Sequence, residues 1–164
     1  MQVRTATPED AAAIARIYNE GIEDRIATFE TQPRTAEDVG GWFDGVHPIV
    51  VVTENHEVIA FAATSTYRPR HCYDGIAEFS IYVARSARGR GAGKLALENL
   101  IETAEKAGYW KLVSRIFPEN KNSLNLVRAC GFREVGVYEK HGQLDGIWRD
   151  VVIVERLLPN NLLR

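Results

Sequence analysis

A glycine-rich basic run, Arg88-Gly89-Arg90-Gly91-Ala92-Gly93-Lys94, constrains the fold of this chain more than any other segment. It lies between residues 76–83, a β-branched and aromatic stretch typical of a strand, and residues 91–107, whose apolar positions recur at helical spacing. Glycine has no side chain and tolerates positive φ, so successive backbone N–H groups in such a turn can point toward one phosphate. The following helix adds unpaired N–H groups and the positive end of its dipole. The run therefore predicts a strand-to-helix turn that binds a pyrophosphate.

The spacing of this turn excludes two common nucleotide-binding patterns. From Gly89 to Lys94 the run is too short for a P-loop, and Leu95 stands where a P-loop has its Mg²⁺-binding hydroxyl. The alternate glycines do not satisfy GxGxxG, and no acidic residue follows in a second strand about 20 residues later, as a dinucleotide fold requires. A basic loop that only caps a helix is the simplest alternative. Three glycines at one turn exceed what capping needs, which favours a phosphate ligand.

Length and composition bound the kind of protein. The chain has 164 residues, 45% of them hydrophobic and 26% charged, which suits a single domain over residues 1–164. A net charge of −2 and a pI near 6.1 argue against a nucleic-acid partner. No apolar run approaches the ~20 residues of a membrane span, and no signal peptide is recognised, so we expect a cytoplasmic protein with no membrane partner. Cys72 and Cys130 are then free thiols, and the scattered histidines predict no metal site.

The remaining segments predict a mixed sheet. Strands are expected over residues 2–6, 49–53, 58–66, 76–83, 110–117, 132–138 and 148–157, with a turn containing Gly142 and Gly146 before the last. Helices are expected after Thr7, from Thr35 through Trp42 and Phe43, over residues 91–107 and over residues 122–130. The order β-α-α-β-β-β-α-β-α-β-β indicates an α/β fold, with a central mixed sheet flanked by helices on both faces.

These motifs carry a resemblance. The chain resembles the GNAT superfamily of N-acetyltransferases, whose [Q/R]-x-x-G-x-[G/A] pattern here spans Arg88 to Gly93. It is similar to the phosphinothricin-type branch in Ala77-Glu78 before Ile81-Tyr82-Val83, in the Asn120 loop, and in Gly146-x-Trp148-x-Asp150-Val151. Residues 67–70 and 144–156 are most similar to arsinothricin N-acetyltransferases. The resemblance implies the GNAT fold, acetyl-CoA as donor and a homodimer.

The resemblance also implies the contacts of acetyl-CoA. The backbone of Ile81, Tyr82 and Val83 would pair with the pantetheine like an added strand. The distal pantetheine would contact Asn120 and Ser123. The pyrophosphate would be held by Arg88, Gly89, Arg90, Gly91, Ala92, Gly93 and Lys94.

Glu78 is the candidate general base. Acetyl transfer to an amine needs a neutral nucleophile, so a nearby group must take a proton from the ammonium. Glu78 lies in an apolar strand just before the glycine-rich turn, where desolvation favours a carboxyl that accepts a proton, and the family has its catalytic carboxylate at this position. The alternative is an outward-facing glutamate on a solvated face. Backbone N–H groups near Tyr82 and Val83 are the expected oxyanion donors.

The proton donor to the leaving thiolate is less defined. Many acetyltransferases have a tyrosine in the helix after the asparagine loop, and this chain has Val127 there. A thiolate with a pKa near the model value of ~8.5 could leave unassisted. A tyrosine such as Tyr73 or Tyr138 is the alternative.

The acceptor is expected to be an amino acid that carries a second anionic group. An arginine fork binds carboxylate, phosphinate or arsinate through two parallel hydrogen bonds, and Arg68 and Arg70 flank Pro69 just before the Glu78 strand. The resemblance favours Arg70, with Thr28, Phe29 and Tyr73 as further acceptor contacts. It implies arsinothricin, or a glutamate analogue such as phosphinothricin, as acceptor. The alternatives are methionine sulfoximine or another small amino acid and, in another class, a non-catalytic acetyl-CoA sensor.

Overall fold

The computed structural model describes residues 1–163 and contains a seven-stranded sheet of order β1-β2-β3-β4-β5-β7-β6. Every neighbouring pair is antiparallel except β4 and β5, which run parallel. The strands are β1 (Gln2–Thr5), β2 (Ile49–Glu54), β3 (Glu57–Thr66), β4 (Ile76–Val83), β5 (Lys111–Ile116), β6 (Arg133–Leu144) and β7 (Ile147–Leu157). The α-helices are α1 (Ala11–Asp24), α2 (Ala36–Gly40), α3 (Ala92–Lys106) and α4 (Lys121–Ala129).

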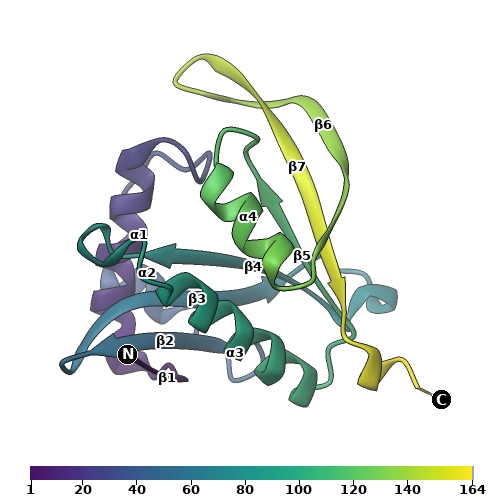
Figure 1. Ribbon diagram of the computed structural model, residues 1–164, viewed down its shortest axis with the longest axis horizontal. Helices are drawn as coiled ribbons and strands as arrows, with labels where there is room; N and C mark the ends of the chain where they lie inside the picture. Colours follow the sequence, from purple (N-terminus) through teal and green to yellow (C-terminus); the bar gives the residue numbers. More distant parts are fainter. Residues whose placement is uncertain (164) are drawn as a thin grey trace.

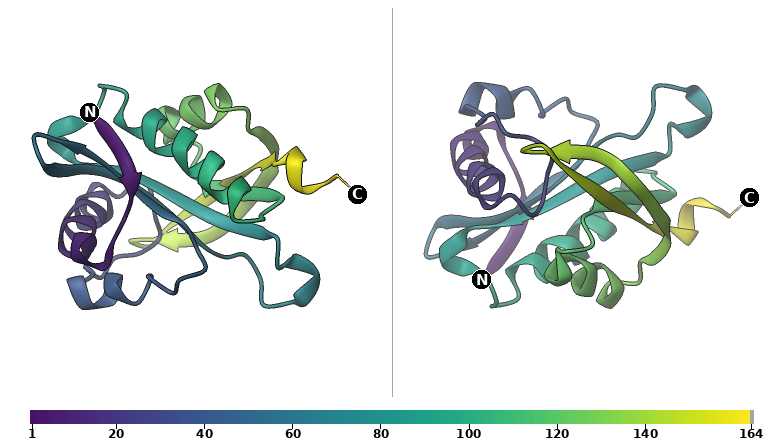
Figure 2. Two further views of the ribbon diagram at one scale, coloured as in Figure 1. Left: turned by 90° about the horizontal axis from the view of Figure 1, so that it is seen from below. Right: turned by 90° about the horizontal axis from the view of Figure 1, so that it is seen from above.

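The helices cover both faces of the sheet. Helices α1 and α2 lie on one face, and α3 and α4 lie on the other (Figure 1, Figure 2). The core between these layers includes Ile14 and Ile17 of α1, Phe61 of β3, and Leu97 and Leu100 of α3, all fully buried. The predicted mixed sheet with helices on both faces is thereby confirmed. In residues 1–163, no helix is long and apolar enough to cross a membrane.

Helix α2 is shorter than predicted. It ends at Gly40, so Trp42 and Phe43 lie beyond it instead of inside it. Glycine is a poor helix former, and Gly40 is followed by a second glycine. Outside the helix, the Trp42 ring packs edge-on against Tyr18, with ring centroids 5.6 Å apart, and against Phe61 at 6.0 Å. Tertiary packing of the aromatic side chains therefore overrides the helical pattern.

Strand β6 is longer than predicted, because a polar segment with a glycine continues the strand. The β6–β7 pairing is interrupted between Tyr138 and Gly142 and then resumes, so Gly142 belongs to the strand and not to the turn. The turn itself falls at Asp145 and Gly146, which have positive φ of 52° and 77°. The resulting hairpin extends well beyond the rest of the sheet (Figure 1).

The sheet opens between its two parallel strands. Pairing of β4 with β5 covers only Ile76 to Glu78 opposite Lys111 to Val113, although both strands continue further. Just past the last pair, the Ser114 hydroxyl donates a hydrogen bond of 2.8 Å to the Phe79 carbonyl. Beyond this bond the strands separate, which leaves backbone groups of β4 without a partner strand on that side.

Candidate active site

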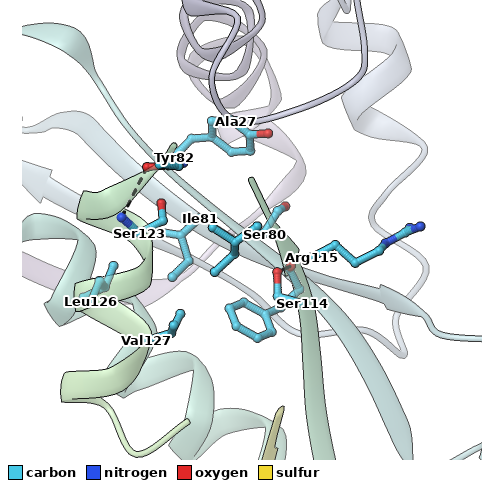
Figure 3. Close-up of a pocket in the computed structure, with 12 residues that line it drawn as sticks. Ala27, Ser80, Ile81, Tyr82, Ser114, Arg115, Ser123, Leu126 and Val127 are labelled. Carbon is cyan, nitrogen blue, oxygen red and sulfur yellow. Dashed lines mark hydrogen bonds between the residues drawn. The ribbon is translucent and has the colours of Figure 1, made fainter. Parts of the chain in front are cut away.

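A cavity occupies the opening between β4 and β5, and we call it the strand cavity. Figure 3 shows Ser80 and Ile81 of β4 on one side and Ser123, Leu126 and Val127 of α4 on the other. Its lining consists of Ala27, Phe79, Ser80, Ile81, Tyr82, Ser114, Arg115, Ile116, Asn120, Ser123, Leu126 and Val127. The cavity is therefore bounded by the edges of β4 and β5, by α4 and by the segment after α1.

Four of the residues predicted to contact pantetheine line the strand cavity: Ile81, Tyr82, Asn120 and Ser123. Asn120 is the N-cap of α4, and its side-chain oxygen accepts a hydrogen bond from the Ser123 N–H at 3.3 Å. Val83, the last residue of β4, is not part of the lining within residues 1–163. An extended amide-bearing chain could pair with the free edge of β4 in this cavity, as an added strand does.

The glycine-rich turn has the backbone conformation expected of a phosphate site. Gly89 and Gly91 have positive φ of 78° and 88°, and a Cβ at either position would meet no atom within 4 Å. Helix α3 begins at Ala92, and its first capping bond runs from the Leu95 N–H to the Gly91 carbonyl. The N–H groups of residues 92–94, Lys94 included, precede that bond and have no acceptor within the helix. Positive φ, open space and free donors together fit a pyrophosphate group, as the sequence predicts.

The arginines of this turn are held by acids from other elements. Arg88 Nη2 lies 2.7 Å from the Asp24 carboxylate at the end of α1, and Arg90 Nη1 lies 2.9 Å from Glu54 at the end of β2. Burial of Asp24 opposes its ionisation, but hydrogen bonds from Arg85 and Arg88 outweigh burial and hold the pKa of that carboxyl below its usual range. Both arginines are therefore oriented before any ligand arrives.

Glu78 lines a second cavity, which we call the Glu78 cavity. Its lining consists of Tyr18, Ala27, Thr28, Phe29, Glu30, Ser65, Glu78, Phe79, Ser80, Tyr82, Ser114, Arg115, Phe117 and Val151. It adjoins the strand cavity, since the two share Ser80, Tyr82 and Ser114. The Glu78 side chain is 22% exposed, and its Oε1 lies 2.7 Å from Nε of Arg115. The carboxylate is therefore ion-paired, where the sequence suggested one isolated among apolar residues.

The predicted acceptor contacts divide into two groups. Thr28 and Phe29 line the Glu78 cavity, and the Phe29 ring packs edge-on against Phe117 with centroids 4.8 Å apart. Arg70 and Tyr73 do not line it in the part of the chain that the structure describes. They belong to the loop between β3 and β4, which projects from the sheet (Figure 2); Arg70 is exposed, and Tyr73 packs against a neighbouring tyrosine of the same loop.

The tyrosines that line the two cavities differ from the proton donors suggested by the sequence. Tyr73 and Tyr138, the suggested proton donors, line neither cavity within residues 1–163. Tyr82 lines both cavities and Tyr18 lines one, and burial raises the pKa of both phenols. Val127, which replaces the usual tyrosine, is buried against the strand cavity.

Two residues of β5 were missed by the sequence reasoning. Ser114 and Arg115 line both cavities, and each contacts β4, through the Phe79 carbonyl and the Glu78 carboxylate respectively. The available signal was a serine and an arginine side by side between the apolar residues Leu112, Val113 and Ile116. Their contact with the Glu78 strand depends on the parallel register, which local patterns do not reveal.

The mixed sheet, its opening between β4 and β5 and the glycine-rich turn before α3 fit an enzyme that transfers acyl groups. Residues 14–132 match the Acetyltransferase (GNAT) family, and the chain belongs to that family. Phosphinothricin N-acetyltransferase of Streptomyces coelicolor is 32% identical over 165 residues, covering 96% of this chain and 96% of that protein. The L-methionine sulfoximine/L-methionine sulfone acetyltransferase of Pseudomonas paraeruginosa is 31% identical, covering 93% and 92%. The crystal structure of a Sinorhizobium meliloti phosphinothricin acetyltransferase in complex with AcCoA has a TM-score of 0.88 at 30% identity, covering 95% and 87%.

Proposed function

We propose that this chain, as a single domain, transfers an acetyl group from acetyl-CoA to the α-amino group of a small amino acid. The observation that carries the proposal is the position of Glu78. Its carboxylate lines the Glu78 cavity, which adjoins the strand cavity. The base in one cavity therefore lies next to the cavity bordered by the free edge of β4. The acetyl-CoA complex of the Sinorhizobium relative supports the same donor for this chain.

Glu78 acts as the general base in this proposal. It takes a proton from the ammonium of the acceptor, and the neutral nitrogen then forms the new bond to the acetyl carbon. Acetyl-CoA, when bound, supplies the acetyl group as a thioester. Backbone N–H groups of Tyr82 and Val83 are the proposed donors to the oxygen that gains charge. The bond from the acetyl carbon to sulfur breaks, the sulfur leaves as a thiolate, and the second proton of the nitrogen passes to the thiolate through solvent. Of the donors suggested by the sequence, Tyr73 and Tyr138 lie outside both cavities and Val127 offers no proton, whereas Tyr82 and Tyr18 are the tyrosines that line the cavities.

The proposed donor contacts are those of the strand cavity and the glycine-rich turn. Pantetheine pairs with the backbone of β4 and reaches the N-terminus of α4. The pyrophosphate is held by the turn. The residues concerned are Ile81, Tyr82, Val83, Arg88, Gly89, Arg90, Gly91, Ala92, Gly93, Lys94, Asn120 and Ser123.

The proposed acceptor is arsinothricin or a related glutamate analogue such as phosphinothricin. The phosphinothricin relatives and the walls formed by Thr28 and Phe29 support a small amino acid. The Pseudomonas relative favours methionine sulfoximine as the alternative. Arg70 and Tyr73 remain proposed contacts. They reach the acceptor only if the projecting loop moves toward it.

We also propose a homodimer. The long β6–β7 hairpin has a set of large apolar side chains that are 48–61% exposed, which is unusual for a free surface. They are Val135, Val137, Tyr138, Ile147, Trp148 and Leu157. Light scattering on the purified protein is expected to give twice the chain mass, and a monomer at all concentrations would contradict the proposal.

Thiol release from acetyl-CoA tests the activity. The purified protein is incubated with phosphinothricin, arsinothricin, methionine sulfoximine and ordinary amino acids, and each product is identified by mass spectrometry. We expect N-acetylated products, with the glutamate analogues preferred. A strong preference for an ordinary amino acid over all three analogues would contradict the proposed acceptor. Acetyl-CoA binding without thiol release for any acceptor would favour the sensor.

The role of Glu78 is tested by Glu78→Gln, which keeps the shape of the side chain and removes the base. We expect turnover at saturating acceptor to fall by about 10²–10⁴-fold, with acetyl-CoA binding retained. Glu57→Gln is the matched control, because Glu57 is an exposed strand glutamate that lines neither cavity. Unchanged turnover in Glu78→Gln would exclude Glu78 as the base.

A further inference from the structure

Arg115 is the one cationic side chain that lines the Glu78 cavity within residues 1–163. Two acidic residues line the same cavity, Glu30 and Glu78. The Glu30 carboxylate is paired at 2.9 Å with Arg34, which lies four residues further along the same loop. Arg115 pairs with Glu78. An anionic group that enters this cavity can therefore pair only with Arg115 among the lining residues, and Arg115 is already paired with Glu78.

The sheet geometry explains why this pair forms. Glu78 and Val113 are the last partners of the parallel β4–β5 ladder, and Arg115 follows Val113 by two residues on the same face. Its side chain extends away from Ser80 and Ile81, out of the strand cavity (Figure 3), and its Nε reaches Glu78 Oε1 at 2.7 Å. Arg115 is 55% exposed and Glu78 is 22% exposed, so the arginine can leave the pair more readily than the glutamate.

The charges of the pair complement those of a free amino acid. An amino acid at neutral pH has an ammonium and a carboxylate on adjacent carbons, and the cavity offers a carboxylate and a guanidinium in hydrogen-bond contact. A guanidinium binds a carboxylate through two parallel hydrogen bonds, which is a better match than the single Nε contact with Glu78. Exchange of partners then leaves no charge unpaired.

We propose that Arg115 binds the α-carboxylate of the acceptor, while Glu78, released from Arg115, receives the acceptor's ammonium. This inference rests on the proposed acetyltransferase function and deepens it. In the empty site, Arg115 holds Glu78 in place and satisfies its charge. An acceptor with a free α-carboxylate draws Arg115 away and exposes the base beside its own amine. An amine that lacks the carboxylate leaves Glu78 paired and is a poor acceptor.

The experiment compares each acceptor with its α-carboxamide, which keeps the amine and side chain but lacks the α-carboxylate. Kinetic constants are measured by thiol release for the wild type, Arg115→Gln and Arg115→Lys. We expect the wild type to prefer the free acid. Arg115→Gln is expected to raise the KM of the free acid about 10-fold or more, the range of a charged hydrogen bond, without weakening the carboxamide as an acceptor, because Glu78 is then unpaired for both. Arg115→Lys keeps the charge and is expected to restore part of the preference.

The matched control is Arg133→Gln, because Arg133 also pairs with a strand glutamate, Glu155, at 2.7 Å, but lines neither cavity. It is expected to keep the wild-type preference for the free acid. If Arg115→Gln raises KM equally for acid and carboxamide, Arg115 only supports the structure and the inference is wrong. If the wild type acetylates no amine at all, the proposed function itself fails. If Arg115→Gln does not fold, Arg115→Lys decides the outcome: its KM for the free acid relative to that for the carboxamide must differ from the wild-type ratio.

Discussion

At the scale of single residues, the position of Tyr82 depends on a glycine of α1. A Cβ at Gly21 would lie 2.4 Å from Cε1 of Tyr82, far inside van der Waals contact. The Tyr82 ring cannot give way, because it also stacks on Phe61 at 5.5 Å and packs against Tyr18 at 5.0 Å. Since Tyr82 lines both cavities, Gly21 connects the packing of α1 to the active site.

We predict that Gly21→Ala destabilises the protein. Helix propensity alone would stabilise the variant by about 1 kcal/mol, whereas overpacking a rigid core costs about 1–3 kcal/mol. We expect overpacking to win, with a net loss of up to about 2 kcal/mol in the free energy of unfolding measured with urea. Gly40→Ala is the control, because a Cβ at the end of α2 would meet no atom within 4 Å. A Gly21→Ala variant as stable as Gly40→Ala would show that Tyr82 can move.

At the scale of elements, one side chain marks the place where β4 and β5 separate. Ser114 is buried, and its hydroxyl bonds to the Phe79 carbonyl immediately after the last pair of the ladder. Without that donor, the carbonyl would be a buried acceptor with no strand opposite it. A buried polar group that loses its partner costs about 1–3 kcal/mol.

We predict that Ser114→Ala lowers the free energy of unfolding by about 1–3 kcal/mol and raises the KM for acetyl-CoA, because the lost bond borders the strand cavity. Thr64→Val is the matched control. Thr64 is also buried and donates to the Pro48 carbonyl at 2.7 Å, but it lines neither cavity. It is expected to lose stability without a change in KM. Equal changes in KM for both variants would contradict a local role for Ser114.

Local sequence patterns predict some of these elements and contacts but not others. The strand over residues 76–83 and the helix after Gly91 are predictable, because β-branched periodicity and a positive-φ glycine are local signals. The end of α2 is not, since the position of Trp42 is decided by contacts with the rings of Tyr18 in α1 and Phe61 in β3. The Glu78–Arg115 pair is equally hidden, because it arises from the register of strands distant in the sequence. Arg70 was predicted to contact the acceptor because it precedes the Glu78 strand in the sequence, yet its loop projects from the sheet (Figure 2).

At the scale of the whole molecule, carboxylates with lowered pKa hold separate parts of the fold together. A hydrogen bond from Arg4 lowers the pKa of Asp10, where β1 leads toward α1. On β7, burial opposes ionisation of Glu155, but bonds from Lys111 and Arg133 prevail and lower its pKa. Each such carboxyl stabilises the fold above the pKa that it has in the unfolded chain. That contribution disappears as the pH falls through the folded pKa.

Asp44, in the segment after α2, allows the sharpest test of this acid dependence. Hydrogen bonds from the backbone and side chain of His47 lower its pKa from 3.8 to about 2. The stabilisation should therefore be complete above about pH 4 and lost toward pH 2. Because Asp44 is 43% exposed, solvent screening limits this stabilisation to the order of 1 kcal/mol.

We predict that Asp44→Asn lowers the free energy of unfolding by about that amount at pH 7, and that the difference from wild type shrinks as the pH approaches 2. Urea unfolding at several pH values measures it, with Glu57→Gln as an exposed control. A difference that stays constant with pH would mean that the charge of Asp44 does not stabilise the fold.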